Sequence, residues 1–156
     1  MYLWKVDSLV DDFKSGQVSQ REELKYMLLF TIVMALASDP LAHIGSSYNF
    51  YDAIDSVLII GISILGIYSC YKINKNGDNR EFIVRMMCIG LPVMIRTLVV
   101  FVPVFFIGGI LEMAFLDSAP DDDEFYETTA VQAAMLPAYV AAYYWYLSMK
   151  IRAVSA

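Results

Sequence analysis

The chain is built around one long apolar run, FIVRMMCIGLPVMIRTLVVFVPVFFIGGILEMAFL, at residues 82–116. At about 1.5 Å per residue, a helix of this length would reach roughly 52 Å. The hydrocarbon core of a bilayer is only about 30 Å thick. Arg96 divides the run, and no basic residue follows it there. We therefore expect one long helix, with a membrane span at 97–116 and a cytoplasmic stem at 82–96.

Gly90 and Pro92 lie within this run, where they would bend the helix. The alternative is that the run forms two separate spans joined by a turn near Pro92. Two spans here would give the chain five crossings. The acidic segment after the run would then lie in the cytoplasm and the basic C-terminus outside, against the charge preference of each side.

Charge is distributed unevenly around this run. The segment before it contains Lys72, Lys75 and Arg80. The segments 38–55 and 112–127 contain no Lys or Arg, yet they hold more than half of the seventeen Asp and Glu residues. Cytoplasmic loops of membrane proteins carry an excess of Lys and Arg. The pattern predicts an integral membrane four-helix bundle, all-α, with both termini cytoplasmic.

The other three spans are expected at 24–44, 53–71 and 128–149, and the whole chain, 1–156, is expected to be one transmembrane domain. The first span has a short apolar centre, so a half-inserted helix is the alternative there. Asp52 is a candidate N-cap for the second span. Residues 1–18 predict a short amphipathic helix that ends at Gly16 and packs against the bundle or the inner leaflet. Ser19 and Glu22 match a capping box that would start the first span.

The composition agrees with a membrane location. The chain is 58% hydrophobic and 18% charged, with a net charge of −6, and its mean hydropathy is +0.53. Soluble domains are nearer 45–50% apolar and about 25% charged. Nucleic acid is not expected as a partner, because phosphate binding requires clustered Lys and Arg. Cys70 and Cys88 lie near the basic segment, which is predicted to face the reducing cytosol. We therefore expect both to be small apolar side chains packed between helices, with no disulfide.

Arg96 is the basic residue most deeply embedded in apolar sequence, and Arg85 precedes it by about three helical turns on the same face. An arginine at this depth must snorkel, pair or face water. Two interpretations stay open. Arg96 either reaches a lipid phosphate at the inner interface, or it forms a buried pair or guards an aqueous cavity. Glu22 and Glu23 are the carboxylates nearest to it in predicted depth.

Asp39, Asp55 and Glu112 lie at the predicted outer ends of three different spans. Each could face headgroup water separately, or the three could converge on a vestibule that attracts cations. A metal site formed by Asp39 and His43 is a third alternative, but the chain lacks any recognised ligand spacing, so no metal is predicted. The acidic segment 121–124 is expected to be a solvated loop, since it lacks the spacing of a calcium loop.

Small residues mark two helix faces that would allow close packing. Gly61 and Gly66 lie in the second span. In the fourth span, alanine recurs at every fourth position, which predicts contact with a helix of this chain or of a neighbouring subunit. The residues Tyr143–Tyr146 that follow predict an aromatic belt at the inner interface. The alanines are Ala130, Ala134, Ala138 and Ala142.

The stretch Ile89-Gly-Leu-Pro-Val-Met-Ile-Arg96-Thr-Leu-Val-Val100 resembles part of the third helix of the phosphate-starvation-inducible E family, which are small bacterial four-span membrane proteins. The shared features are the Ile-Gly pair, an arginine six residues after that glycine, and a basic loop before them. The resemblance implies four spans and a bacterial inner membrane. It carries over only Arg96, and the chain departs from the family in Pro92 and its acidic last loop.

No motif of a nucleophile, phosphate-binding loop, metalloprotease or dinucleotide site is present, so neither an enzyme nor a cofactor is predicted. The expected function is that of a small interaction or regulatory subunit that acts through helix packing and its cytoplasmic face. The expected partners are the lipid bilayer and either further copies of the chain or another membrane protein. The alternative is a homo-oligomeric pore with an acidic outer vestibule.

Overall fold

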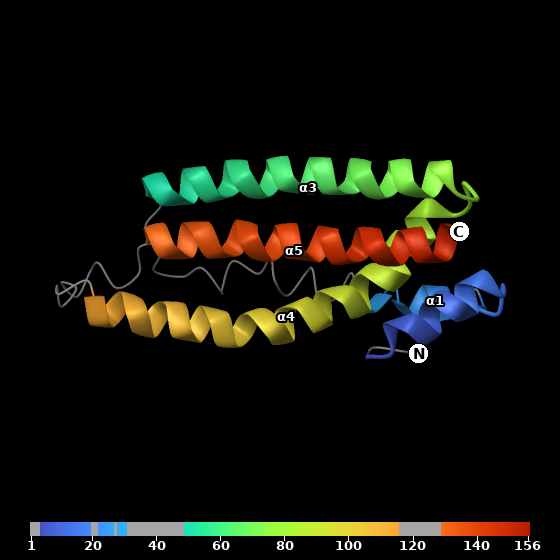
Figure 1. Cartoon of the computed structure of the whole chain (residues 1–156), viewed down its shortest axis with the longest axis horizontal. Coiled ribbons are helices and arrows are strands. Elements are labelled where there is room, and N and C mark those ends of the chain that lie inside the picture. The colour runs from blue at the N-terminus through green and yellow to red at the C-terminus, as the bar shows by residue number, and fades with distance from the viewer. Residues whose placement is uncertain (1–3, 20–21, 27, 31–48, 116–128) are drawn as a thin grey trace.

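The computed structural model describes residues 4–19, 22–26, 28–30, 49–115 and 129–156, and all regular secondary structure in these ranges is helical. The labelled helices are α1 (Val6–Lys14), α3 (Phe50–Asn76), α4 (Phe82–Phe115) and α5 (Ala130–Ser155) (Figure 1). Residues 22–26 and 28–30 are also helical. The prediction of an all-α chain is therefore confirmed for the described residues.

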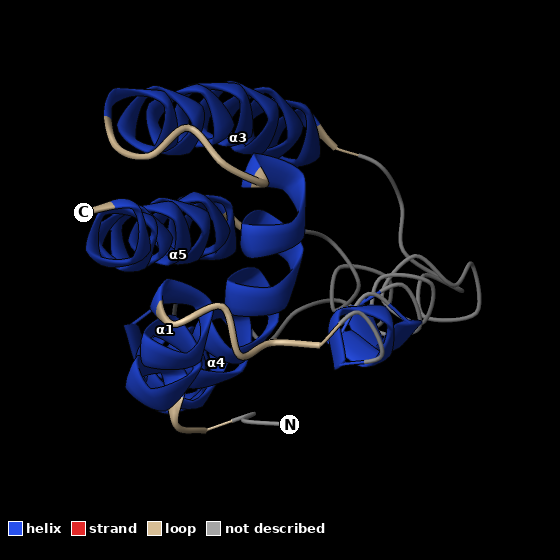
Figure 2. Cartoon of the chain, turned by 90° about the vertical axis from the view of Figure 1, so that its right-hand side faces the viewer, coloured by secondary structure: helices blue, strands red, loops and turns tan. Residues whose placement is uncertain are grey.

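α5 lies between α3 and α4 and packs against both (Figures 1 and 2). α3 and α5 run in the same direction, and α4 runs in the opposite one (Figure 1). α1 packs against α4 and α5 at the end of the bundle where α3 ends and α4 begins. This alternation of direction is what three successive crossings of a bilayer require.

α4 is one continuous helix that contains both Pro92 and Pro103. The prediction of a single long helix is confirmed, and the alternative of two spans separated by a turn near Pro92 is wrong. α4 is visibly bent in its first half (Figure 1). A proline removes one backbone hydrogen bond from a helix and its ring crowds the preceding turn, which is the usual cause of such a bend.

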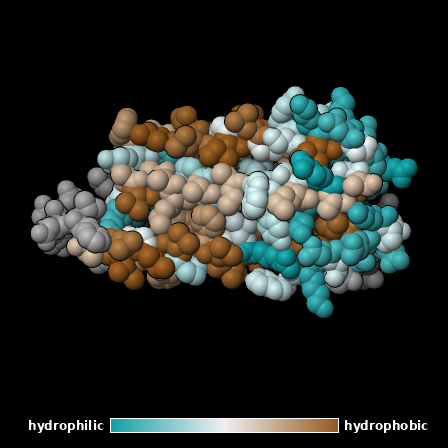
Figure 3. All heavy atoms as spheres, in the orientation of Figure 1, coloured by the Kyte–Doolittle hydropathy of each residue, from teal (hydrophilic) through white to brown (hydrophobic). Residues whose placement is uncertain are grey.

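Burial divides α4 into two parts. Cys88, Ile89, Leu91 and Val93 are at most 1% exposed. Beyond Thr97 the large apolar side chains of α4 mostly face outward, and Figure 3 shows this apolar surface extending over α3 and α4 toward the end opposite α1. The exposed fractions in α4 include Leu98 at 46%, Val100 at 64%, Phe106 at 71% and Ile110 at 64%.

Two described helical segments, Phe50–Asn76 and Phe82–Glu112, are long and apolar enough to cross a membrane. Burying apolar surface away from water gains about 25 cal/mol per Å². The many exposed apolar side chains of α3 and α4 would therefore have an unfavourable free energy of hydration in water. The division in α4 falls where the sequence predicts that the stem ends and the span begins, which makes Thr97 the boundary between protein-packed and outward-facing apolar residues.

α1 buries its apolar face on the bundle. Val6, Leu9, Val10 and Phe13 are between 0 and 8% exposed and join one core with residues of α4 and α5. Gly16 then ends the segment with a φ of +67°, a left-handed conformation that favours glycine. Of the two predicted locations for this helix, the bundle is therefore the correct one.

The start of α3 corrects one prediction. The N-cap is Asn49, not Asp52, and the two form a reciprocal capping box. The Asn49 side-chain oxygen accepts a hydrogen bond from the Asp52 amide at 3.1 Å, and the Asp52 carboxylate accepts one from the Asn49 amide at 2.7 Å. An acidic residue in the first turn resembles an N-cap in sequence, because both positions favour Asp.

α3 and α5 are also longer than the predicted spans. α3 continues to Asn76 and α5 to Ser155. Lys72 and Lys75 are therefore helical residues, and so are Lys150 and Arg152, rather than members of loops. Long basic side chains at a helix end can extend toward an aqueous interface while the helix itself continues.

Several predictions fall outside the described residues. Most of the predicted first span at 24–44 does, as do Asp39, His43 and the acidic segment 117–127. Within the described part, the Ser19 hydroxyl accepts a hydrogen bond from the Glu22 amide at 3.4 Å, in agreement with the predicted cap. Cys70 and Cys88 are buried and free of any disulfide, as expected.

Candidate functional site

Arg96 lies in a cluster formed by three helical segments. Its Nη1 donates a hydrogen bond of 2.8 Å to the hydroxyl of Tyr146 on α5. Its guanidinium carbon lies 5.6 Å from the centre of the Trp4 ring, just before α1. Lys150 of α5 also approaches Tyr146, with its Nζ 5.3 Å from the centre of the Tyr146 ring. We call Trp4, Asp7, Arg96, Tyr146 and Lys150 the interfacial cluster.

Asp7 is the acidic member of the interfacial cluster. Its carboxylate accepts a hydrogen bond of 2.5 Å from Lys150 Nζ. This bond, and the positive charges of Lys150 and Arg96, hold the pKa of Asp7 below its ordinary value, against a smaller opposing effect of burial. The described carboxylate that acts on Arg96 thus belongs to α1. Glu23, one of the two predicted partners, lies near Glu81 instead, and burial followed by the Glu81 charge raises the pKa of Glu23.

We predict that protonating Asp7 loosens α1. Because the folded-state pKa of Asp7 is lowered, its contribution is present above the unfolded pKa and is lost as the pH falls through the folded value. The Asp7 side chain is 71% exposed, and such pairs contribute about 0.5 kcal/mol, roughly a twofold change in the docking equilibrium. Acrylamide quenching of Trp4 in a Trp145→Phe background, where Trp4 is the only remaining tryptophan, should therefore increase below about pH 4.

The matched control is Asp7→Asn in the same background. It should raise the quenching at neutral pH and remove the acid-dependent step. An acid step of unchanged size in Asp7→Asn would assign the transition to another carboxyl and contradict the prediction.

Arg85 has a different environment from Arg96, although both lie on α4. Its side chain is 6% exposed and forms two hydrogen bonds to the Asp78 carboxylate, of 2.5 and 2.6 Å. A third bond of 3.1 Å reaches the Asn74 side-chain oxygen. The bonds from Arg85 keep the pKa of Asp78 below its ordinary value. Arg85 therefore stabilises the connection between α3 and α4, and its charge is satisfied within the protein.

The short connection between α3 and α4 has an unusual backbone. Asn79 and Glu81 adopt φ values of 53° and 43°, in the left-handed region that costs a residue other than glycine about 1 kcal/mol or more. The Asn74 side-chain amide donates to the carbonyl of Arg80 at 3.2 Å. The amide of Asp78 donates to the carbonyl of Ser155 at 3.0 Å. The same network that neutralises Arg85 thus holds this strained turn against the end of α5.

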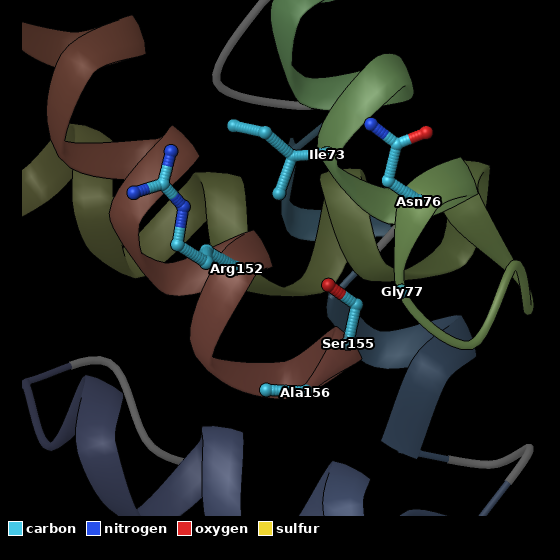
Figure 4. A pocket seen from close by; sticks show the side chains of 6 residues that line it. All are labelled: Ile73, Asn76, Gly77, Arg152, Ser155 and Ala156. Carbon is cyan, nitrogen blue, oxygen red and sulfur yellow. The ribbon is translucent and has the colours of Figure 1, made fainter.

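A shallow pocket of about 330 Å³ lies beside this turn, between the last turns of α3 and α5 (Figure 4). Arg152 and Ser155 extend from α5, and Ile73 and Asn76 from α3. Gly77 allows the two ends to meet, because a Cβ at this position would collide with the carbonyl and side chain of Ser155. The pocket marks where the C-terminal end of α5 docks on the α3–α4 turn.

Two of the three carboxylates predicted for the outer side are described, and they lie near the end of the bundle opposite α1. Asp55 is near the start of α3, and Glu112 is near the end of α4. Each has one buried side-chain oxygen without a hydrogen-bond partner among the described residues. A buried polar atom without a partner costs about 1–3 kcal/mol. The described residues bring no group of three or more His, Cys, Asp or Glu side chains together.

The predicted packing residues divide into two groups. Gly66 contacts α5, because a Cβ there would collide with the Tyr144 ring, whereas a Cβ on Gly61 would meet nothing within 4 Å. The alanine stripe lies mainly on the exposed side of α5. Its first three members are exposed and the fourth is partly buried, while the buried face of α5 contains Ala133 and Pro137. The stripe is therefore not the main contact of α5 with either α3 or α4.

The prediction of an aromatic belt at Tyr143–Tyr146 is correct only in part. Tyr143 and Tyr144 form an edge-to-face pair with ring centres 4.9 Å apart. The Tyr143 hydroxyl lies against Gly90 of α4, and the Tyr144 ring lies against Gly66 of α3. Both tyrosines therefore fill the gaps between helices rather than the headgroup region. Trp145, at 68% exposure, is the member of the run that faces outward.

Sequence reasoning selected Arg85 and Arg96 but missed their partners. The sequence pattern singles out neither Asp78 nor Asp7 as a partner of these arginines. One signal was available for Asp78, since it lies within seven residues of Arg85 across a tight turn. No comparable signal joins Asp7 to Lys150, which is 143 positions away.

Comparison with protein-family models, with curated proteins and with solved structures finds no match to this chain. The resemblance of the third helix to the phosphate-starvation-inducible E family therefore stays a prediction.

Proposed function

We propose that the chain is a non-enzymatic integral membrane protein that acts as an interaction or regulatory subunit. Its four spans place both termini in the cytoplasm, in an arrangement suited to a bacterial inner membrane. The observation that carries the proposal is the division of α4 at Thr97. Cys88, Ile89, Leu91 and Val93 before this point are buried against protein, and most large apolar residues beyond it face outward. About eighteen helical residues beyond the division would extend roughly 27 Å, close to the thickness of the hydrocarbon core.

The packed end of the bundle is the part that would meet a cytoplasmic partner. It combines α1, the strained turn at 77–81 and the last turns of α3 and α5, and it is fixed by the Arg85–Asp78 and Lys150–Asp7 pairs. Figure 3 shows hydrophilic residues gathered at this end. A polar surface attached to outward-facing apolar helices is the arrangement that a membrane-bound interaction subunit needs.

We predict the orientation from charge and test it with single added cysteines. Cys70 and Cys88 are at most 1% exposed, so they can remain in place. A membrane-impermeant maleimide should label Asp122→Cys in intact cells, and it should label Lys75→Cys only after permeabilisation. The reverse pattern would contradict the orientation, and recovery of the protein in the soluble fraction would contradict the membrane location.

The pore is the second candidate, because Asp55 and Glu112, toward the end of the bundle opposite α1, each have one buried oxygen without a partner in the described part of the chain. A pore requires a closed ring of copies and cation flux in liposomes that falls in Asp55→Asn and Glu112→Gln. A subunit predicts tight liposomes and co-purification of another membrane protein in mild detergent. Flux that depends on these carboxylates would replace the proposed function with the pore.

A further inference from the structure

The interfacial cluster contains two positive charges, on Arg96 and Lys150, and one negative charge, on Asp7. Arg96 and Lys150 converge on Tyr146 from two helices, and Asp7 is the single described carboxylate that acts on both. Arg85 provides the contrast, because its guanidinium donates hydrogen bonds to both carboxylate oxygens of Asp78. Among the described residues, Arg96 donates instead to a neutral hydroxyl, that of Tyr146, while the buried Nε atoms of both arginines lack an acceptor. Within the part of the chain that the structure describes, Arg96 therefore forms no hydrogen bond to a carboxylate and shares the charge of Asp7 with Lys150.

The depth of the cluster defines which anion could reach it. Arg96 immediately precedes Thr97, where the side chains of α4 begin to face outward. Trp4 is 57% exposed beside Arg96, and tryptophan is enriched at the level of lipid headgroups. Basic pockets between membrane helices on the cytoplasmic side are the ordinary binding sites of anionic headgroups.

We propose that Arg96 and Lys150 bind the phosphate diester of one anionic phospholipid of the inner leaflet, with Trp4 lying at the headgroup level. This inference rests on the membrane location proposed above. A lipid phosphate, rather than free phosphate, is the occupant because acyl chains attached to it would continue along the outward-facing apolar side chains beyond Thr97. Arginine and lysine both form charge-assisted hydrogen bonds to phosphate oxygens.

Asp7 limits this site. Its carboxylate already accepts a hydrogen bond from Lys150 Nζ, so it competes with a phosphate for the same ammonium group. Docking of α1 and binding of the lipid are therefore opposed. Removing the charge of Asp7 should strengthen lipid binding, although it weakens the contact of α1.

The test is retention of phosphatidylglycerol, measured by native mass spectrometry of the full chain released from nanodiscs that contain equal phosphatidylglycerol and phosphatidylcholine. We expect preferential retention of phosphatidylglycerol. Arg96→Gln and Lys150→Gln should each reduce the preference by about tenfold, the loss expected for one charged hydrogen bond. Asp7→Asn should increase it. The matched controls Arg152→Gln, an exposed cation on the same helix, and Asp11→Asn, an exposed acid on α1, should leave it unchanged.

Equal effects in Arg152→Gln and Lys150→Gln would show general charge attraction and overturn the site, as would displacement of the lipid by inorganic phosphate. If Arg96→Gln fails to insert, Lys150→Gln and Asp7→Asn still give changes of opposite sign, and the absence of both overturns the proposal. Failure of the unaltered chain to enter nanodiscs would instead contradict the proposed membrane location.

Discussion

Asp78→Ala is expected to lower the free energy of unfolding by about 3 kcal/mol. The substitution leaves the guanidinium of Arg85 buried at 6% exposure with the Asn74 oxygen as its described acceptor. Breaking a buried ion pair from one side costs about 3–5 kcal/mol, because the remaining charge is uncompensated. The lower end applies because the Asp78 side chain is 33% exposed. Thermal unfolding in detergent, followed by circular dichroism, measures the change.

A double-mutant cycle separates the pair from its surroundings. Replacing both members with apolar side chains, Asp78→Ala with Arg85→Met, should recover most of the lost stability, since no charge is then left buried. Arg80→Met is the control in the same turn, because its side chain is exposed, and surface changes of this kind stay within about 0.5 kcal/mol. A double variant as unstable as Asp78→Ala would show that the strained backbone of the turn, rather than the pair, determines the loss.

The sequence predicted the helices well because their signals are local. The length of the run at 82–116 and the capping box at Ser19 and Glu22 are each set by neighbouring residues. The cap of α5 is equally local but was not predicted, and there the Thr129 hydroxyl accepts a hydrogen bond from the Gln132 amide at 3.3 Å. The predicted stem of α4 also coincides with the part that the structure buries. That agreement follows from Arg85 and Arg96, which an apolar span could not contain without partners.

The packing of helices was not predictable in the same way. Alternating crossings make α3 and α5 parallel, but no sequence pattern says that α5 lies between α3 and α4. The alanine stripe lies mainly on the exposed side of α5, and an exposed face in a bilayer is as apolar as a buried one, so the sequence does not distinguish the two. Tyr143 and Tyr144 resembled an interfacial belt for the same reason, although each fills a space beside a glycine of another helix. The contact with a neighbouring subunit that the stripe also predicts stays a prediction.

Gly66→Ala is expected to destabilise the contact between α3 and α5, whereas Gly61→Ala is not. A Cβ at Gly66 would collide with the Tyr144 ring, and one at Gly61 would meet nothing within 4 Å. Overpacking costs about 1–3 kcal/mol, while replacing glycine with alanine within a helix gains up to about 1 kcal/mol. The two variants, on one helix and with identical chemistry, should therefore differ by about 2 kcal/mol in thermal unfolding experiments.

The size of this difference depends on whether Tyr144 can move. Its ring is held edge-to-face against Tyr143 with ring centres 4.9 Å apart, and its hydroxyl lies near Ser63 of α3. The Tyr143 hydroxyl in turn lies against Gly90, so a shift of one tyrosine presses the other toward α4. Tyr144→Ala in the Gly66→Ala background should therefore recover part of the stability. If Gly66→Ala alone is as stable as Gly61→Ala, the tyrosine pair yields freely, and α5 is not held between its neighbours by close packing at these glycines.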